Sequence, residues 1–600
     1  MIYRKCNPIS FSLLIIVLLK TVTGYSQENK DFTWWNPATN EFPVIEGQAW
    51  PAEMKGGYDR LPQRAEKLVR KDVWELAKNA AGLIITFFSN SPEIVVRYKV
   101  SEKQAFPHMP ATSVSGVDLY GIGKDGGWLW CKGNYSFGDT ITYRFRNIDS
   151  KDSLYPFHPK GGEYKLYLPL YNTVTWLEIG TVAGTSFRQV PLRKDKPIVV
   201  YGTSIAQGGC ASRAGMAWTA ILGRKLDHQL INLGFSGNGL LEKELMDFLV
   251  EIDAKVYVLD CLPNLIGKNY SPAEMKERII QSVKIIRNSK PLTPVLLTEH
   301  AGYTDALINP RSRGKVDSIN TQLQEAFRQL QQDGVKNIFL LTKKEINLDD
   351  NSTVDGTHPT DLGMFQYAEA YEKKLRLILH EPSGVFSTTK PCTQNRDANT
   401  YDWLSRHNEF IDLKEKKSPA IVFIGNSITH YWSGEPMAPI SRGSDSWTKM
   451  IAPSNVINAG FGWDRIENVL WRVYHDELDG FAAKQVVILI GTNNLDYNPD
   501  KEIIDGLKLL VEAIKIRQPA AKILLMGLIP RREKEKRIVQ LNKSIAMLAS
   551  SLRITYTDPG KGLLNKDGTI DAASFTEDGV HPNETGYTRM AKVMQPLLVK

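Results

Sequence analysis

The feature that most constrains the fold of this chain is a pattern that occurs twice. A short apolar run ends in Gly-x-Ser-Ile at two places, with the serines at Ser204 and Ser427. An Asp-Gly-x-His-Pro segment follows each of them, with the histidines at His358 and His581. Each serine precedes its histidine by 154 residues. Unrelated turn and surface residues would not be expected to keep that register independently, so we predict an internal duplication of one domain.

The residues around these motifs alternate between brief apolar runs and longer amphipathic stretches in both halves of the chain. Brief apolar runs are typical of strands buried on both faces, and their alternation with helices predicts a parallel sheet covered on both sides. We therefore expect two doubly wound α/β domains, each three layers thick. The expected strands are 198–201, 230–232, 256–259, 295–298 and 338–341, then 420–424, 456–458, 486–490, 523–526 and 554–557; the expected helices are 272–288, 316–332, 500–517, 532–551 and 583–598.

The region before the first copy has a different pattern. Short runs of β-branched and aromatic residues, several of them alternating with period two, are separated by Gly, Pro, Asp and Asn. That pattern is typical of antiparallel strands and predicts a β-sandwich. The expected strands are 94–100, 141–145, 164–168 and 175–179, and one short helix is expected at 72–81.

Domain boundaries follow from these patterns. The chain has 600 residues, too many for one core at about 150 residues per domain. A stretch rich in Pro, Thr and Ser separates the two copies and is typical of a linker. The predicted organisation is a signal peptide at 1–26, a β-sandwich at 27–195, α/β domains at 196–380 and 401–600, and the linker at 381–400.

The first residues have the order of a secretory signal. Arg4 and Lys5 precede an apolar run at 9–19, and small or polar residues follow it. The run is shorter than the roughly 20 residues of a membrane-spanning helix, and Cys6 lies before it, unlike a lipoprotein cysteine. We predict a secreted or periplasmic protein with no stable membrane anchor after cleavage; an uncleaved anchor is the alternative.

Charge and cysteine content exclude several classes of protein. The net charge of +8 comes from 74 basic and 66 acidic residues without a basic block, which argues against a nucleic-acid partner. Four cysteines after the signal do not make a disulfide scaffold, and neither CxxC nor a Cys/His cluster at ligand spacing indicates zinc. Cys210 and Cys261 are compatible with a bond and equally with two buried thiols.

The repeated residues form two candidate catalytic sets. A serine hydroxyl becomes a good nucleophile when a neighbouring base takes its proton, and histidine does this near neutral pH. An aspartate three residues before each histidine, Asp355 and Asp578, can bond the other ring nitrogen and fix the tautomer. The tetrahedral intermediate also needs hydrogen-bond donors for its oxyanion. Candidate donors follow the second and third strands of each copy, at 234–238, 260–264, 460–464 and 491–494.

These blocks resemble those of the SGNH (GDSL-like) hydrolase family over both α/β halves. The resemblance implies a flavodoxin-like fold, ester hydrolysis through an acyl-serine, and no metal or organic cofactor. It implies that Ser204 and Ser427 are the nucleophiles. By the same resemblance, His358 with Asp355 and His581 with Asp578 complete the triads. The oxyanion donors it implies are the backbone of Gly237 and the side chains of Asn264 and Asn493.

Two positions depart from the family pattern. The third block of the first copy has Leu-Pro before Asn264 where Gly-x-Asn-Asp is usual, so its assignment is weaker than that of Asn493. In the second copy Trp463 stands where glycine is usual; either its own backbone N–H or that of Gly462 can be the donor. The segment 460–472 is similar to the platelet-activating-factor acetylhydrolase branch of the family.

Residues 116–120, Gly-Val-Asp-Leu-Tyr, resemble the motif of a β-domain that accompanies SGNH hydrolases in Bacteroidota-type bacteria. Such proteins resemble polysaccharide O-acetylesterases, which makes an acylated glycan the expected substrate. One alternative is a lipid or lysophospholipid esterase, which should carry an apolar lid. The other is one catalytic domain with a degenerate, glycan-binding copy. The oligomeric state stays open.

Overall fold

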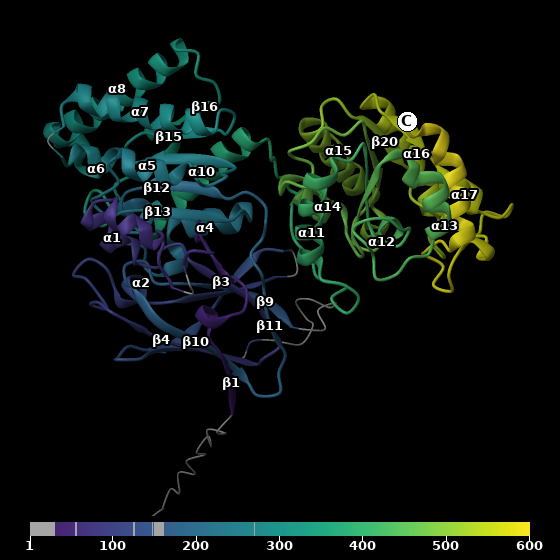
Figure 1. The fold of residues 1–600 in the computed structure, drawn as a ribbon, viewed down its shortest axis with the longest axis horizontal. Coiled ribbons are helices and arrows are strands. Elements are labelled where there is room, and N and C mark those ends of the chain that lie inside the picture. Colours follow the sequence, from purple (N-terminus) through teal and green to yellow (C-terminus); the bar gives the residue numbers. More distant parts are fainter. Residues whose placement is uncertain are drawn as a thin grey trace, which may run out of the picture.

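The computed structural model describes residues 31–54, 57–123, 126–146, 148, 161–268 and 270–599. The predicted signal peptide lies outside these residues. Figure 1 shows a β-rich N-terminal part below a first α/β domain and a second α/β domain beside them. Among the helices of the described residues, none is both long and apolar enough to cross a membrane.

The N-terminal part is a sandwich of two antiparallel sheets, as predicted. Its core consists of apolar side chains from both sheets, including Ile94, Val96 and Tyr98 on one and Leu119 and Leu166 on the other. The first sheet has the order β1 (Phe32–Trp35), β10 (Val174–Val182), β4 (Glu93–Val100), β8 (Ile141–Arg146) and β7 (Gly133–Ser136); the second has β11 (Phe187–Gln189), β3 (Ile84–Ser89), β9 (Gly162–Tyr167), β5 (Asp118–Ile122) and β6 (Trp128–Cys131), with β2 (Ile45–Glu46) beside β3.

The sequence predicted one short helix in this part, and its described residues contain two α-helices. Helix α1 (Lys71–Ala77) occupies the expected segment and ends earlier than predicted, and a one-turn helix α2 (Ala111–Val114) follows later in the chain. A four-residue turn has too few residues to show helical periodicity in the sequence.

The first α/β domain has a five-stranded parallel sheet. The strand order is β13 (Leu230–Gly234), β12 (Ile198–Gly202), β14 (Val256–Asp260), β15 (Val295–Thr298) and β16 (Ile338–Leu341). Alternate side chains of β12 enter two different cores: Val199 and Tyr201 on one side, Ile198 and Val200 on the other. The helices are α3 (Ser204–Gln207), α4 (Trp218–Leu226), α5 (Lys243–Leu249), α6 (Leu262–Ile266), α7 (Pro272–Ser289), α8 (Pro310–Gln332), α9 (Lys343–Ile346) and α10 (Asp361–Leu379).

The second α/β domain repeats this topology. Its strands lie in the order β18 (Val456–Gly460), β17 (Ile421–Gly425), β19 (Gln485–Leu489), β20 (Lys522–Met526) and β21 (Thr555–Thr557), all parallel. The two doubly wound sheets confirm the predicted fold class. The principal helices are α11 (Trp403–Lys417), α12 (Ser427–His430), α13 (Ser444–Ser446), α14 (Ile466–Tyr474), α15 (Asp500–Arg517), α16 (Glu535–Ser551) and α17 (Glu584–Met594).

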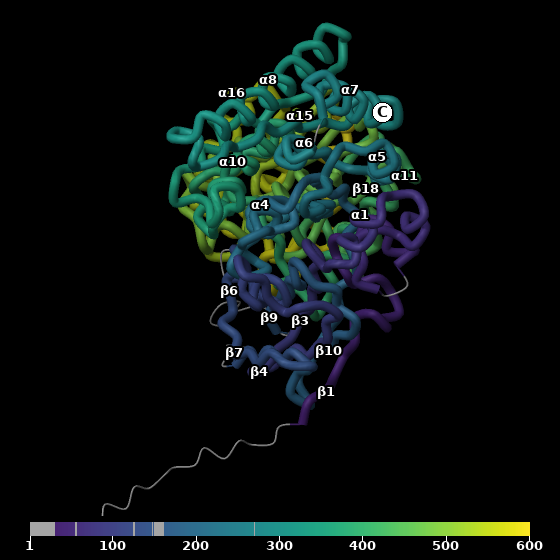
Figure 2. The backbone as a smooth tube through the Cα atoms, turned by 90° about the vertical axis from the view of Figure 1, so that its left-hand side faces the viewer, coloured from purple at the N-terminus to yellow at the C-terminus, as the bar shows by residue number. Residues whose placement is uncertain are grey.

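The segment between the two α/β domains is packed against its surroundings. Glu381 is 1% exposed, and its carboxylate contacts His228 and Lys255 of the first α/β domain and Arg517 of the second. Thr388 donates a hydrogen bond to the backbone of Glu502. The part of the chain predicted as a linker therefore helps to fix the two domains, which lie one behind the other in the perpendicular view of Figure 2.

The Gly-x-Asp-Leu-Tyr segment joins the β-sandwich to the first α/β domain. The Asp118 carboxylate accepts hydrogen bonds from Arg213 Nη1 at 2.8 Å and from the backbone N–H of Gly215 at 2.7 Å. Arg213 also donates to the Tyr120 hydroxyl. A Cβ at Gly116 would lie 2.4 Å from the Thr112 carbonyl oxygen, so only glycine fits there. The motif thus fixes the sandwich beside the loop that follows Ser204.

Candidate active sites

The first serine lies at the carboxyl end of β12, between the edge strand β13 and the central strand β14. Ser204 is the first residue of α3, directly after β12, and the Thr203 side chain caps this short helix. Oγ of Ser204 is 2.9 Å from Nε2 of His358. Because ligands of open α/β sheets bind at this edge, the serine has the position expected of a reacting group.

The aspartate of the first set orients the histidine. Oδ2 of Asp355 is 2.7 Å from His358 Nδ1, while Oδ1 accepts the backbone N–H groups of Thr357 and His358. Burial acts to raise the pKa of Asp355, but hydrogen bonds from the backbone and ring of His358 outweigh it and hold this pKa below the ordinary value. The carboxylate is therefore ionised at neutral pH and keeps the proton of the ring on Nδ1.

The second set has the same geometry. Oγ of Ser427 is 2.8 Å from Nε2 of His581, whose Nδ1 is 2.6 Å from Asp578 Oδ2. Burial acts to raise the pKa of Asp578, yet hydrogen bonds from the ring and backbone of His581 and from the Val580 N–H place it well below its ordinary range. Both predicted sets of Ser, His and Asp are thus brought together, each within one α/β domain.

The loops after the second strands both have a left-handed residue at the same position. Gly237 has a φ of 70° and Trp463 a φ of 63°, so the tryptophan occupies the left-handed position of the glycine. The Gly462 N–H donates to Nδ1 of His430, whose pKa is lowered to about 2 by burial and by neighbouring arginines. Since Gly462 is already engaged there, Trp463 is the closer counterpart of Gly237.

The two asparagines both contact the loop that follows the second strand of their domain. Nδ2 of Asn264 donates to the carbonyl of Phe235 at 3.3 Å, and Nδ2 of Asn493 donates to the carbonyl of Asp464 at 2.9 Å. An amide nitrogen has two hydrogens, so each keeps a second N–H. Despite its altered third block, the first copy therefore also places its asparagine beside the loop that follows the second strand.

Sequence reasoning missed the side chains around the triads. The His108 ring, from the β-sandwich, lies 6.3 Å from the His358 ring, and the Tyr171 hydroxyl donates to the Ser204 carbonyl. In the second domain the Tyr431 ring lies 5.6 Å from His581, and Arg442 Nη1 is 3.8 Å from Asp578. No spacing rule connects these residues to the triads, because tertiary packing brings them there.

The cysteines settle one open alternative. Cys210 and Cys261 are both buried and free, and Cys261 lies 3.6 Å from the carbonyl oxygen of Tyr201. They are two buried thiols, which leaves the first site without a disulfide.

Comparisons with known proteins agree with this arrangement. Residues 195–376 match the GDSL-like Lipase/Acylhydrolase family, and residues 423–589 match a family of the same description. Residues 32–187 match the N-terminus of Esterase_SGNH_hydro-type proteins, a family named GxDLY. The matched ranges correspond to the sandwich and the two α/β domains.

Individual relatives give the same result. The chain is 31% identical over 205 residues to the bovine platelet-activating factor acetylhydrolase IB subunit alpha1, covering 33% of this chain and 83% of that protein. The human alpha2 subunit is 31% identical over 204 residues, with 33% and 84% covered. A solved structure titled "a putative GDSL-like lipase from Bacteroides ovatus" is 32% identical with a TM-score of 0.52, covering 58% of this chain and 98% of that one. The chain is therefore an ester hydrolase that belongs to the GDSL-like lipase/acylhydrolase (SGNH) family and carries two of its domains behind a GxDLY domain.

Proposed function

We propose that both hydrolase domains cleave small acyl esters, chiefly acetyl esters of polysaccharides or oligosaccharides, in the periplasm or outside the cell. The observation that carries the proposal is the duplicated triad, with Ser–His distances of 2.9 and 2.8 Å. The relatives are named acetylhydrolases, which supports a small acyl group.

The proposed reaction has two steps at each site. In the first domain, Ser204 Oγ attacks the ester carbonyl carbon while its proton passes to His358 Nε2. The Gly237 N–H and the Asn264 amide stabilise the oxyanion, and the sugar alcohol leaves with the proton from His358. Water, deprotonated by the same histidine, then attacks the acyl-serine and releases the carboxylic acid. Ser427, His581, Trp463 N–H and Asn493 act in the same way in the second domain.

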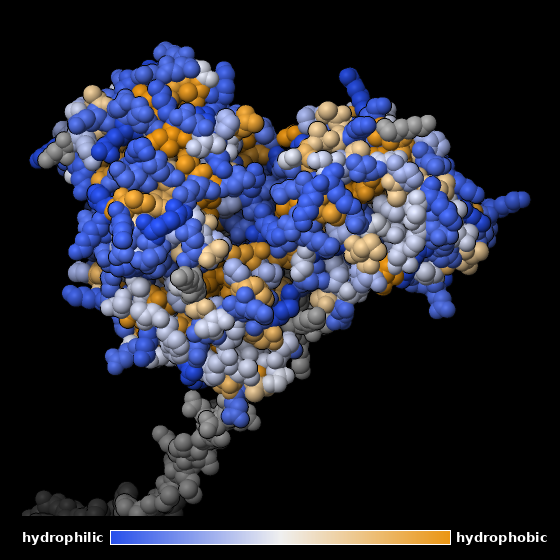
Figure 3. Space-filling model, viewed as in Figure 1, coloured by the Kyte–Doolittle hydropathy of each residue, from blue (hydrophilic) through white to orange (hydrophobic). Residues whose placement is uncertain are grey.

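The surroundings of both sites favour a polar substrate. The Asp355 and Asp578 side chains are 42% and 41% exposed, so the triads lie near the surface. Histidine, tyrosine and arginine side chains stand beside them, groups that hydrogen-bond or stack with sugars. On the face in Figure 3, apolar residues occur in separate groups among hydrophilic ones. The polar groups beside the triads therefore favour a glycan substrate over a long acyl chain.

A lipid ester is the second candidate, because the relatives named above act on platelet-activating factor by their names. Acetate release from a panel of acetylated polysaccharides, compared with hydrolysis of acetylated and long-chain phospholipids, separates the two. Acetate from a polysaccharide at more than about ten times the phospholipid rate is the expected result. Hydrolysis confined to lipid esters would replace the glycan assignment.

Removing either asparagine should slow hydrolysis at its own site. We expect Asn264→Ala, measured with Ser427→Ala, and Asn493→Ala, measured with Ser204→Ala, to lower kcat by about 10²–10³, as loss of one oxyanion donor does elsewhere. Steady-state kinetics on a soluble acetyl ester gives the value. A change in kcat below about fivefold would remove that asparagine from the oxyanion site.

His108 should affect polymer binding at the first site only. It is exposed and comes from a different domain than the triad. In the Ser427→Ala background, we expect His108→Ala to raise KM for a polysaccharide about two- to fivefold, the effect of losing one partly exposed contact of about 0.5–1 kcal/mol. The KM for a small acetyl ester serves as the control and should stay unchanged. Equal changes with both substrates would show that His108 acts on the triad itself.

A further inference from the structure

Three buried side chains meet where the three domains join, away from both triads. Asp195 lies in the segment between β11 and β12, His228 lies two residues before the start of β13, and His475 directly follows α14. They are 2%, 3% and 1% exposed, respectively. One possible ligand atom of each lies within 4.8 Å of those of the other two. Polar groups this deep need partners, since leaving a buried polar atom unpaired is unfavourable.

The contacts of His228 leave one ring nitrogen available. Its Nε2 is 2.7 Å from Oε2 of Glu381, whereas its Nδ1 is buried without a hydrogen-bond partner among the described residues. Glu381 is also in contact with Lys255 and Arg517, at 3.2 and 3.0 Å. A carboxylate can only accept, so Nε2 bears the N–H, and Nδ1 is the ring nitrogen left to bind a ligand.

His475 is fixed in the opposite tautomer. Its Nδ1 is 2.6 Å from the Trp471 carbonyl oxygen and must donate to it. With the N–H on Nδ1, the neutral ring carries its lone pair on Nε2. That lone pair faces the carbonyl oxygen of Asp227 at 3.2 Å.

Asp195 completes the set. Neither of its carboxylate oxygens has a hydrogen-bond partner among the described residues. Arg193 Nε is 3.2 Å from Oδ1 but not aligned to donate, and Arg193 Nη2 donates instead to the Asp227 carbonyl. Other buried cations have their own carboxylates: Lys255 pairs with Glu381 and Asp476, and Lys165 with Asp227. The cluster therefore brings together one carboxylate, two imidazole nitrogens and one carbonyl oxygen.

We propose that this cluster binds a divalent transition metal of the zinc class through Asp195, His228 Nδ1 and His475 Nε2, with the Asp227 carbonyl beside them. Imidazole and carboxylate ligands suit zinc. Metal-bound histidines donate their other ring N–H to a carboxylate or a backbone carbonyl, and both histidines already do so here. The last turn of α14 also places its carbonyl groups, the negative end of the helix dipole, at the cluster.

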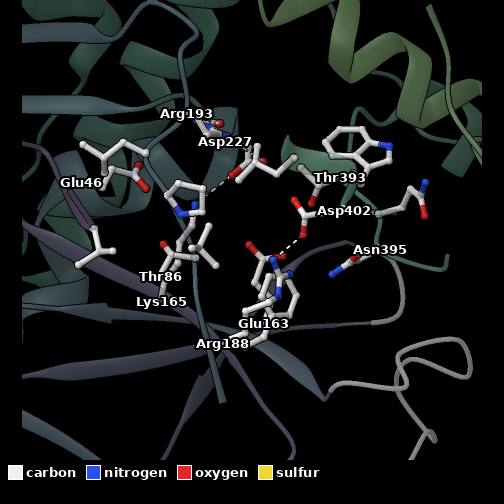
Figure 4. Close-up of a pocket in the computed structure, with 18 residues that line it drawn as sticks. Glu46, Thr86, Glu163, Lys165, Arg188, Arg193, Asp227, Thr393, Asn395 and Asp402 are labelled. Atoms are coloured by element: carbon white, nitrogen blue, oxygen red, sulfur yellow. Dashed lines mark hydrogen bonds and ion pairs between the residues drawn. The ribbon is translucent and has the colours of Figure 1, made fainter. Parts of the chain in front are cut away.

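The proposed metal would hold three parts of the chain together. Asp195 lies in the segment that connects the sandwich to the first hydrolase domain. His228 belongs to the first hydrolase domain and His475 to the second. Arg193 and Asp227, which border the cluster, also line a pocket with Glu163 and Lys165 of the sandwich and Asp402 of the second hydrolase domain (Figure 4). This role is structural and does not depend on the proposed esterase function. The ligands are too far apart in sequence for any ligand-spacing rule to reveal them.

Metal content of the purified full chain tests the proposal. After dialysis against a chelator and then against Zn²⁺, we expect about one tightly held zinc per chain by plasma mass spectrometry. Co²⁺ in its place should give visible absorption bands. Asp195→Asn replaces one carboxylate oxygen by an amide NH₂, whereas His228→Gln and His475→Asn remove the ligand nitrogen but keep an N–H for the outer hydrogen bond. We expect at least tenfold weaker zinc binding for each variant. His300→Gln changes another buried histidine and should keep the metal.

Thermal unfolding gives a second readout. Zinc should raise the Tm of wild type and of His300→Gln, and should leave the Tm of the three ligand variants unchanged. Wild-type protein that binds no zinc, or ligand variants that bind it as tightly as wild type, would overturn the proposal. If a ligand variant fails to fold, the wild-type stoichiometry and the Co²⁺ spectrum alone decide it.

Discussion

Ser204→Ala and Ser427→Ala are each expected to stop turnover at one site and leave the other working, and the double variant is expected to lose ester hydrolysis. Removing the nucleophile of a serine hydrolase costs about 10⁶ in kcat. The change should leave the fold intact, because each variant loses only one hydroxyl and its hydrogen bond to the histidine. Acetate release gives the rates.

The serine variants have a matched control and a clear contradiction. Ser550→Ala changes an exposed serine of α16 and should behave as wild type. One single variant that equals wild type, with the other inactive, would show that only one domain catalyses. That result would favour the degenerate glycan-binding copy considered from the sequence.

Asp355→Asn and Asp578→Asn are the second pair with a large expected effect. An asparagine can turn an N–H toward Nδ1 of the histidine, which forces the ring proton onto Nε2. The ring then cannot accept the serine proton, and we expect kcat to fall by about 10⁴, as the same change does in a serine protease. Asp355→Asn is measured in the Ser427→Ala background, and Asp578→Asn in the Ser204→Ala background.

The controls for this pair are aspartates in similar turns without a histidine. Oδ1 of Asp349 accepts the Asn351 N–H, and Oδ1 of Asp567 accepts the Thr569 N–H. Asp349→Asn and Asp567→Asn should keep wild-type kcat. Retention of more than about a tenth of kcat in Asp355→Asn or Asp578→Asn would remove that carboxylate from the mechanism.

Much of the architecture could be predicted because it repeats in the sequence. Strands buried on both faces give continuous apolar runs, and the 154-residue spacing between serine and histidine linked two domains that share one topology. Those signals are local or periodic. They predicted the doubly wound sheets, the sandwich and the Ser, His and Asp residues that the structure brings together.

What the sequence missed depends on contacts between domains. His108 reaches the first site because Asp118 fixes the sandwich against Arg213, and no local pattern encodes that contact. The Pro/Thr/Ser-rich stretch predicted a linker. Glu381 within it is nevertheless buried, and it pairs with Lys255 of the first hydrolase domain and Arg517 of the second. Composition describes a segment alone and does not report what packs on it.

The number of reactive serines per chain tests the central claim of two independent esterase sites most directly. We would treat the protein with an acyl-sized fluorophosphonate, which forms a covalent bond only with an activated serine, and count adducts by intact-mass spectrometry. The account predicts two adducts on wild type, one on Ser204→Ala, one on Ser427→Ala and none on the double variant. A single adduct on wild type, or an adduct that persists in the double variant, would contradict it.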